Sequence, residues 1–167
     1  MLNREGIPYE ELAESEIARQ QSEASRLGLW LLLISISIFF IALSVVLALR
    51  SRVIDEWTGV PIPWGVWLST AILAASSYVL QRSDRVTGIR LGWVFLAVQV
   101  FAWWQIISET GPGSWFFWTF SGLHAIHVLG GLAAFRWARF DLARIYWHFL
   151  TALWLYVMIL FVVLRAR

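Results

Sequence analysis

Histidine can act as an acid, a base or a metal ligand, and all three histidines of this chain lie inside apolar segments. The segments are S-G-L-H-A-I-H-V-L-G-G over residues 121–131 and Y-W-H-F over residues 146–149. At 100° per residue, one helical arc of about 120° holds four small or polar residues of the first segment: Ser121, His124, His127 and Gly131. Such a stripe is expected to face protein, because a polar side chain turned toward lipid tails loses its hydrogen bonds to water.

Histidines inside a membrane could bind a haem or a metal ion. His124 and His127 are neighbours on one predicted helix, so they cannot be axial ligands on opposite faces of one haem. Counted from the loop that joins the two predicted helices, His127 is eight residues in and His148 only three, a difference in depth of about 8 Å. The chain has no cysteine, and no carboxylate lies in an apolar segment to complete a zinc site. We therefore predict that this chain binds no metal and no cofactor.

The sequence also lacks the usual catalytic groups. No acidic residue falls within the apolar segments, so no acidic proton relay crosses the membrane in this chain. We find no nucleophile–base pair, phosphate-binding glycine loop or nucleotide fingerprint. We predict no catalytic residue, and assign structural, lipid or subunit contacts to the following residues: Gln99, Ser121, His124, His127, Gly131, Trp147 and His148.

The composition indicates an integral membrane protein. The chain has 167 residues, of which 59% are hydrophobic and 14% charged, more apolar surface than a soluble domain of this size can bury. Segments of about 18 to 23 apolar residues are long enough to cross a bilayer as helices. They cover residues 27–49, 64–81, 91–108, 114–135 and 145–164. We predict an all-α, polytopic membrane protein, a bundle of five transmembrane helices.

Residues 1–26 are polar and rich in glutamate. A secretory signal peptide would begin with basic residues, so this acidic segment does not resemble one. Pro8 followed by Tyr9, Leu12 and Ile17 indicates either a short amphipathic helix at the membrane surface or a solvated tail. The chain is thus predicted to consist of a cytoplasmic polar segment over 1–26 and a five-helix transmembrane domain over 27–167.

The arginines predict the orientation. With five spans, the N-terminal segment and the loops after the second and fourth spans share one side and hold nine arginines, against four on the other side. Because basic residues concentrate on the cytoplasmic side, we predict a cytoplasmic N-terminus and an external C-terminus. The small net charge of +2 gives no indication of nucleic-acid binding. Tryptophans near the span ends, Trp147 among them, are interpreted as interfacial belts.

The two histidine segments together resemble one family. Residues 117–132, F-x-x-x-S-G-L-H-A-I-H-V-L-G-G-L, are similar to the "TG-hHGhHVhhG" helix of haem–copper oxidase subunit III, and residues 146–149 with Leu153-Trp154-Leu155 resemble its Y-W-H-F-V-D-V-V-W-L helix. The S-T-A-I-L-A-A-S-S-Y-V-L-Q-R segment over 69–82 resembles the family's N-T-L-L-L-L-A-S-S-x-x-L-Q-R segment, with Ser69 where Asn is usual. The region around Gln99 resembles the short bacterial form of the family. The resemblance extends from about residue 26 to the C-terminus.

This resemblance implies an accessory, non-redox subunit III of a bacterial respiratory cytochrome c oxidase in aerobic electron transport. Such a subunit flanks catalytic subunit I in the cytoplasmic membrane, contacts other respiratory-complex subunits, binds phospholipids and supports proton uptake. The haems and copper lie in the partner subunits. Two carboxylates of the family are absent, since Ile36 and Thr151 stand in their places, so the roles of those carboxylates do not carry over.

Three other functions remain as alternatives. The accessory subunit of a nitric oxide reductase belongs to the same family, and these motifs separate it poorly from the oxidase subunit. A di-histidine membrane cytochrome predicts a haem spectrum for the isolated chain. A small transporter predicts charged or unwound residues at the membrane midplane, and the sequence has neither.

Overall fold

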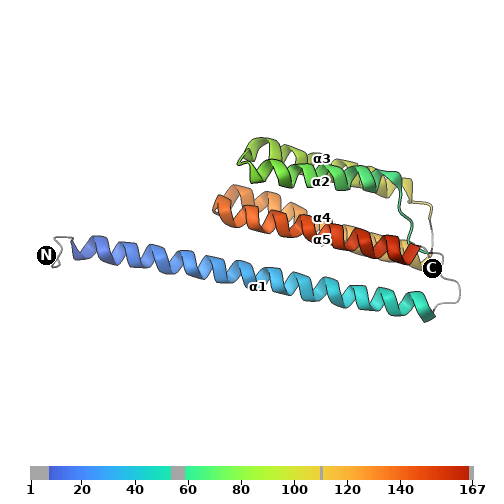
Figure 1. Cartoon of the computed structure of the whole chain (residues 1–167), viewed down its shortest axis with the longest axis horizontal. Helices are drawn as coiled ribbons and strands as arrows, with labels where there is room; N and C mark the ends of the chain where they lie inside the picture. Colours follow the sequence, from blue (N-terminus) through green and yellow to red (C-terminus); the bar gives the residue numbers. More distant parts are fainter. Residues whose placement is uncertain (1–7, 54–58, 110, 166–167) are drawn as a thin grey trace. The chain divides into compact units, whose positions relative to one another are not determined.

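The computed structural model is all-helical over the part of the chain that it describes, residues 8–53, 59–109 and 111–165. The helices of this part are α1 (Tyr9–Val53), α2 (Trp64–Gln81), α3 (Arg85–Gln105), α4 (Pro112–Trp137) and α5 (Phe140–Arg165) (Figure 1). The predicted all-α class is confirmed. The first predicted span differs most, because α1 begins 18 residues earlier and ends four residues later than the apolar segment 27–49. The third differs next, because α3 begins six residues earlier and ends three residues earlier than the apolar segment 91–108.

Four of these helices are long and apolar enough to cross a membrane: α1, α3, α4 and α5. α2 is not one of them. Its 18 residues extend about 27 Å, slightly less than a 30 Å hydrocarbon core, and four of them are serine or threonine. The length and apolar composition of four of the five predicted spans are therefore confirmed, while the crossing by α2 stays a prediction.

α1 is one continuous helix of 45 residues. It runs through residue 26, where the polar segment was predicted to end, and residues 9–26 are helical rather than a solvated tail. Alanine, glutamate, glutamine and arginine dominate this stretch, and all of them favour helix. The chain divides into two compact units inside α1, Met1–Ile36 and Ser37–Arg167.

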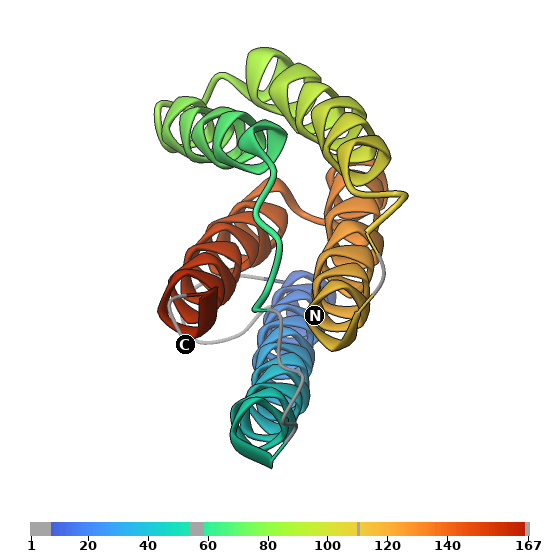
Figure 2. The same cartoon turned by 90° about the vertical axis from the view of Figure 1, so that its right-hand side faces the viewer.

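The second unit contains residues 37–53 of α1 and two helical hairpins, α2–α3 and α4–α5 (Figure 1). α2 also contacts α5, and α3 contacts α4, so the hairpins pack against each other (Figure 2). The loops that close the two hairpins lie at the same end of this unit. In the first loop, Ser83 has a positive φ of 65° and Asp84 caps α3. Aromatic side chains fill the interior, and the largest fully buried ones include Trp147, Trp154 and Phe95.

Glycines set how closely α3, α4 and α5 approach. A Cβ on Gly92 of α3 would lie 2.6 Å from Cη2 of Trp147, and one on Gly131 of α4 would lie 3.0 Å from Cε3 of the same indole. Trp147 therefore sits in a slot that these two glycines leave open. By contrast, a Cβ on Gly130 would meet only the Tyr146 hydroxyl, at 3.8 Å, so Gly131 makes the close helix contact of the Gly-Gly pair.

Candidate functional site

The predicted polar stripe of α4 faces the interior of the second unit. Ser121 and His124 are 1% and 0% exposed, Gly131 is buried, and His127 is half-buried. The prediction that this stripe faces protein is thus confirmed. Ser121 donates a hydrogen bond to the Phe117 carbonyl of its own helix at 2.6 Å.

His124 lies in an aromatic pocket formed by α3 and α5. Its imidazole stacks on the Trp154 ring with centroids 4.7 Å apart and planes 24° from parallel, and it meets Phe95 edge-on at 5.9 Å. Neither ring nitrogen has a hydrogen-bond partner among the described residues. His124 is therefore held by ring packing rather than by hydrogen bonds.

His127 has different surroundings. Its Nδ1 lies 2.7 Å from the carbonyl oxygen of Leu123, one turn earlier in α4, and its ring meets Phe40 at 5.8 Å between centroids. Tyr146 of α5 donates to the His127 carbonyl oxygen at 3.3 Å, so the backbone at this position also joins α4 to α5.

His148 is hydrogen-bonded to α2 instead. Its Nδ1 lies 2.5 Å from the Ser77 hydroxyl, and its Nε2 lies 3.0 Å from the Gln81 side-chain oxygen. The three imidazoles thus have three separate sets of neighbours. Within the described residues, no three His, Asp or Glu side chains converge on a point where they could hold a metal ion.

Trp147 belongs to the core, and its interpretation as part of an interfacial belt was wrong. The side chain is fully buried against Gly92, Gly131 and Phe135, whose ring centroid lies 5.5 Å away. A hydrophobic position near a helix end does not reveal whether it faces lipid or a neighbouring helix. The Trp147 indole nitrogen has no hydrogen-bond partner in the described part of the chain.

Gln99 joins α3 to α2. It is 1% exposed, and its side-chain oxygen lies 2.9 Å from the Ser69 hydroxyl. Its amide nitrogen has no partner within the described residues. In this structure Gln99 thus makes a helix–helix contact, and its partner is Ser69.

Two further hydrogen bonds join side chains of different helices. Trp103 of α3 donates to Ser121 of α4 at 2.9 Å, and Trp154 of α5 donates to Thr70 of α2 at 2.9 Å. Neither bond could be predicted from the sequence, because the Thr70–Trp154 and Trp103–Ser121 pairs are 84 and 18 residues apart along the chain and no local pattern links them. Together with the Ser69–Gln99 pair, these bonds connect the four helices α2 to α5.

Charged groups gather at the hairpin loops. The Asp84 carboxylate accepts a hydrogen bond from the Thr87 amide at 3.0 Å, and this bond holds the pKa of Asp84 below its usual value. Arg85 donates to the Phe135 carbonyl near the end of α4 and lies over the Phe140 ring, 5.8 Å from its centroid. Arg85 therefore ties the α2–α3 loop to the α4–α5 loop.

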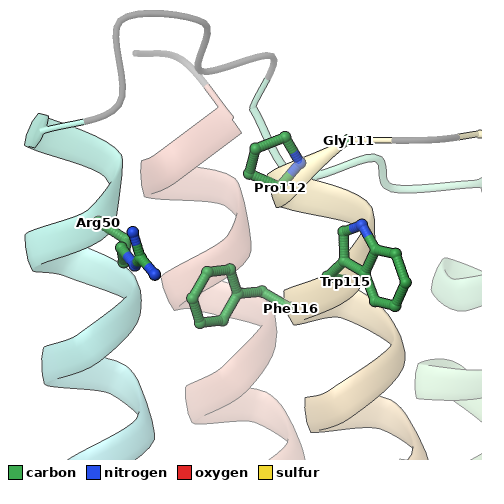
Figure 3. A pocket seen from close by; sticks show the side chains of 5 residues that line it. All are labelled: Arg50, Gly111, Pro112, Trp115 and Phe116. Carbon is green, nitrogen blue, oxygen red and sulfur yellow. The ribbon is translucent and has the colours of Figure 1, made fainter.

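A separate pocket lies away from the two hairpin loops, between the C-terminal end of α1 and the N-terminal end of α4. It encloses about 410 Å³ and is lined by Arg50, Gly111, Pro112, Trp115 and Phe116. Figure 3 shows the Arg50 guanidinium and the Phe116 ring pointing into the space between the two helices.

The described contacts hold the four helices α2 to α5 against one another. The hydroxyl, amide and indole groups form hydrogen bonds between helices. The His124 imidazole packs against other rings, and the His148 imidazole is hydrogen-bonded to α2. A comparison of the chain with protein-family models and with curated proteins finds no match.

Proposed function

We propose that this chain is a non-redox, membrane-embedded accessory subunit of a bacterial respiratory haem–copper oxidase, similar to subunit III. The observation that carries the proposal is the contact between the two segments on which the resemblance rests. Trp147 of Y-W-H-F fits against Gly131 of the S-G-L-H-A-I-H-V-L-G-G segment, and Trp154 stacks on His124. Residues that resemble a family in two separate segments thus form one packed structure, as a shared scaffold requires.

The histidine environments support a structural role over a redox role. An axial haem ligand needs a ring nitrogen that reaches an open space large enough for a porphyrin. Here His148 uses both ring nitrogens toward α2, and His124 is 0% exposed, so neither of its nitrogens reaches an open space. In this proposal, the haems and copper belong to the partner subunits, and the chain supports catalytic subunit I, its phospholipids and its proton uptake.

The proposed topology has five spans in the bacterial cytoplasmic membrane, with the N-terminus cytoplasmic. α2 crosses as one arm of the α2–α3 hairpin. Its buried hydroxyls have partners in α3, since Ser69 bonds to Gln99 and Ser76 donates to the Gly88 carbonyl at 2.7 Å. These bonds lower the cost of placing a less apolar helix in the membrane, because each removes an unsatisfied polar group.

The experiment is purification of the tagged full chain from its native membrane in mild detergent, followed by identification of the partners and a haem spectrum. The proposal expects co-purification of a haem- and copper-containing catalytic subunit with oxygen-reducing activity. A haem-containing partner that reduces nitric oxide would instead indicate the reductase subunit. A chain that purifies without a haem-containing partner, or that holds haem by itself, contradicts the proposal.

A further inference from the structure

A groove of about 390 Å³ lies between α3 and α4. Trp93 and Trp103 belong to its lining and are ten residues, or about 15 Å, apart along α3. Ala97 and Ala125 also line the groove and leave room between the two helices. A groove of this volume, with an apolar and aromatic lining, is typical of a site for a small apolar molecule.

One amide lines this otherwise apolar groove. Gln99 is 99% buried, its oxygen is occupied by Ser69, and its nitrogen has no hydrogen-bond partner among the described residues. A buried donor without a partner costs free energy, and an acceptor supplied by a bound molecule removes that cost. The nitrogen is buried in this structure, so a molecule in the groove reaches it only after the Gln99 side chain rotates.

The depth of Gln99 restricts the source of that oxygen. Gln99 is six residues from the end of α3 at Gln105 and fourteen from its beginning at Arg85, or about 9 Å and 21 Å along the axis. The ester carbonyls of a phospholipid lie at the edge of the hydrocarbon core, so they are too shallow to reach this amide. A molecule that dissolves within the hydrocarbon core can bring an acceptor to this depth.

We propose that the α3–α4 groove binds a flat, apolar, membrane-dissolved molecule with carbonyl oxygens, the chemistry of a quinone, and that one oxygen accepts a hydrogen bond from Gln99. A flat ring over the two alanines is within reach of one of the two tryptophan side chains, which favour offset or edge-on contacts with other rings. This site is independent of the proposed function, because it needs no catalytic partner.

The experiment uses the purified full chain in phospholipid nanodiscs and a photoreactive benzoquinone with a ten-carbon tail. After irradiation, the labelled residues are mapped by peptide mass spectrometry over a range of quinone concentrations. The proposal expects saturable labelling within residues 93–103 and 125–129, displaced by unlabelled decylbenzoquinone. A parallel sample carries a phospholipid with the photoreactive group halfway along its acyl chain, and excess decylbenzoquinone should displace its labelling of the groove.

Two variants and a matched control give the decisive comparison. Ala97→Phe fills the exposed part of the groove and should abolish saturable labelling, whereas Ala71→Phe, at an exposed alanine of α2, should leave it unchanged. Gln99→Leu removes the donor and should weaken apparent quinone affinity about tenfold, the usual effect of losing one such bond. Gel filtration verifies that each variant stays folded.

Equal saturation in Ala97→Phe, Gln99→Leu and the unaltered chain would overturn the proposal. Acyl-chain labelling that quinone does not displace would also overturn it, because the groove would then be an ordinary lipid contact. Both readouts come from the isolated chain, so they are separate from the identity of its co-purifying partners.

Discussion

The three histidines show how residues of one type take different roles within one membrane helix bundle. His148 is a hydrogen-bonded link between α5 and α2, whereas His124 is packed as an aromatic ring without a hydrogen-bond partner in the described part of the chain. Stability should therefore respond oppositely to removal of these two side chains. Removing a hydrogen-bonding side chain lowers stability when its partners remain buried without a bond. Where a side chain has no such partner, its contribution comes from how its shape packs against its neighbours.

We expect His148→Leu to destabilise the chain by about 1 kcal/mol, because it leaves the half-buried Ser77 hydroxyl without its partner and removes a bond to the exposed Gln81. His124→Phe should leave stability unchanged or slightly raised, since phenylalanine keeps the ring contact with Trp154 and removes two buried nitrogens that make no bond. Reversible unfolding of the purified chain in mixed micelles measures both. If His124→Phe is the more damaging variant, the His124 nitrogens have a partner, and the packing role assigned to this residue is wrong.

The direction of the α4 stripe could be predicted from the sequence, but its contacts could not. Helical periodicity places Ser121, His124 and Gly131 on one face, and the cost of exposing polar groups to lipid turns that face inward. Periodicity does not say which neighbour covers the face. The choice of Trp154 and Phe95 around His124 depends on how α3 and α5 are packed, which is a property of the assembled bundle.

At the scale of helices, glycine contacts determine the spacing of α3, α4 and α5. Gly92 and Gly122 are both glycines inside helices, yet only Gly92 has a neighbour where a Cβ would stand. A methyl group at Gly92 must push the Trp147 ring out of its slot, while a methyl group at Gly122 meets nothing within 4 Å. The two positions therefore form a matched pair.

We expect Gly92→Ala to destabilise the chain by about 1–3 kcal/mol, the range for overpacking in a closely packed core. Gly122→Ala should be neutral or stabilising by up to about 1 kcal/mol, since alanine is the better helix former. Near-ultraviolet circular dichroism should report a changed tryptophan environment only in Gly92→Ala. Equal effects of the two substitutions would mean that Trp147 does not occupy the slot between α3 and α4.

The N-cap of α3 gives a pH-dependent prediction. The Thr87 amide bond lowers the folded-state pKa of Asp84, so ionised Asp84 stabilises the fold above its usual pKa. That contribution is lost as the pH falls through the lowered folded-state pKa. We expect the unaltered chain to unfold at a higher temperature than Asp84→Ala near neutral pH, with the difference shrinking in strongly acidic buffer. A difference that is the same at both pH values would show that the carboxylate charge makes no contribution.

The helices themselves were largely predictable from the sequence, because long apolar segments bounded by arginine and proline leave few alternatives. The beginning of α1 was not, since the charged stretch before residue 27 has no proline or glycine after Pro8 to end a helix, and helix-forming residues extend it. The end of α3 was not predictable either. Apolar residues continue to Ile107, but the helix ends at Gln105, whose side chain accepts a hydrogen bond from the Gly65 amide at 3.1 Å.

At the scale of the whole molecule, the number of membrane crossings depends on whether α2 crosses. Among the described helices, the other four meet the length and composition of a membrane span, and α2 does not. Yet α2 makes hydrogen bonds with α3 and α5 through buried or half-buried side chains, including Ser69, Ser76 and Thr70. Because these contacts run along its length, a crossing by α3 and α5 implies a crossing by α2 beside them.

Five crossings and four crossings predict opposite sides for every loop after α2. The chain has no cysteine, so single-cysteine variants labelled by a membrane-impermeant maleimide report each side without background. With five spans and a cytoplasmic N-terminus, we expect external reagent to label Ile62→Cys and Ile107→Cys but to spare Ser22→Cys, Ser83→Cys and Ala138→Cys. If α2 does not cross, Ser83→Cys and Ala138→Cys become external and Ile107→Cys becomes protected, while Ser22→Cys and Ile62→Cys keep their sides and serve as controls. Labelling of Ser22→Cys from outside would instead reverse the whole orientation, against the nine-to-four distribution of arginines.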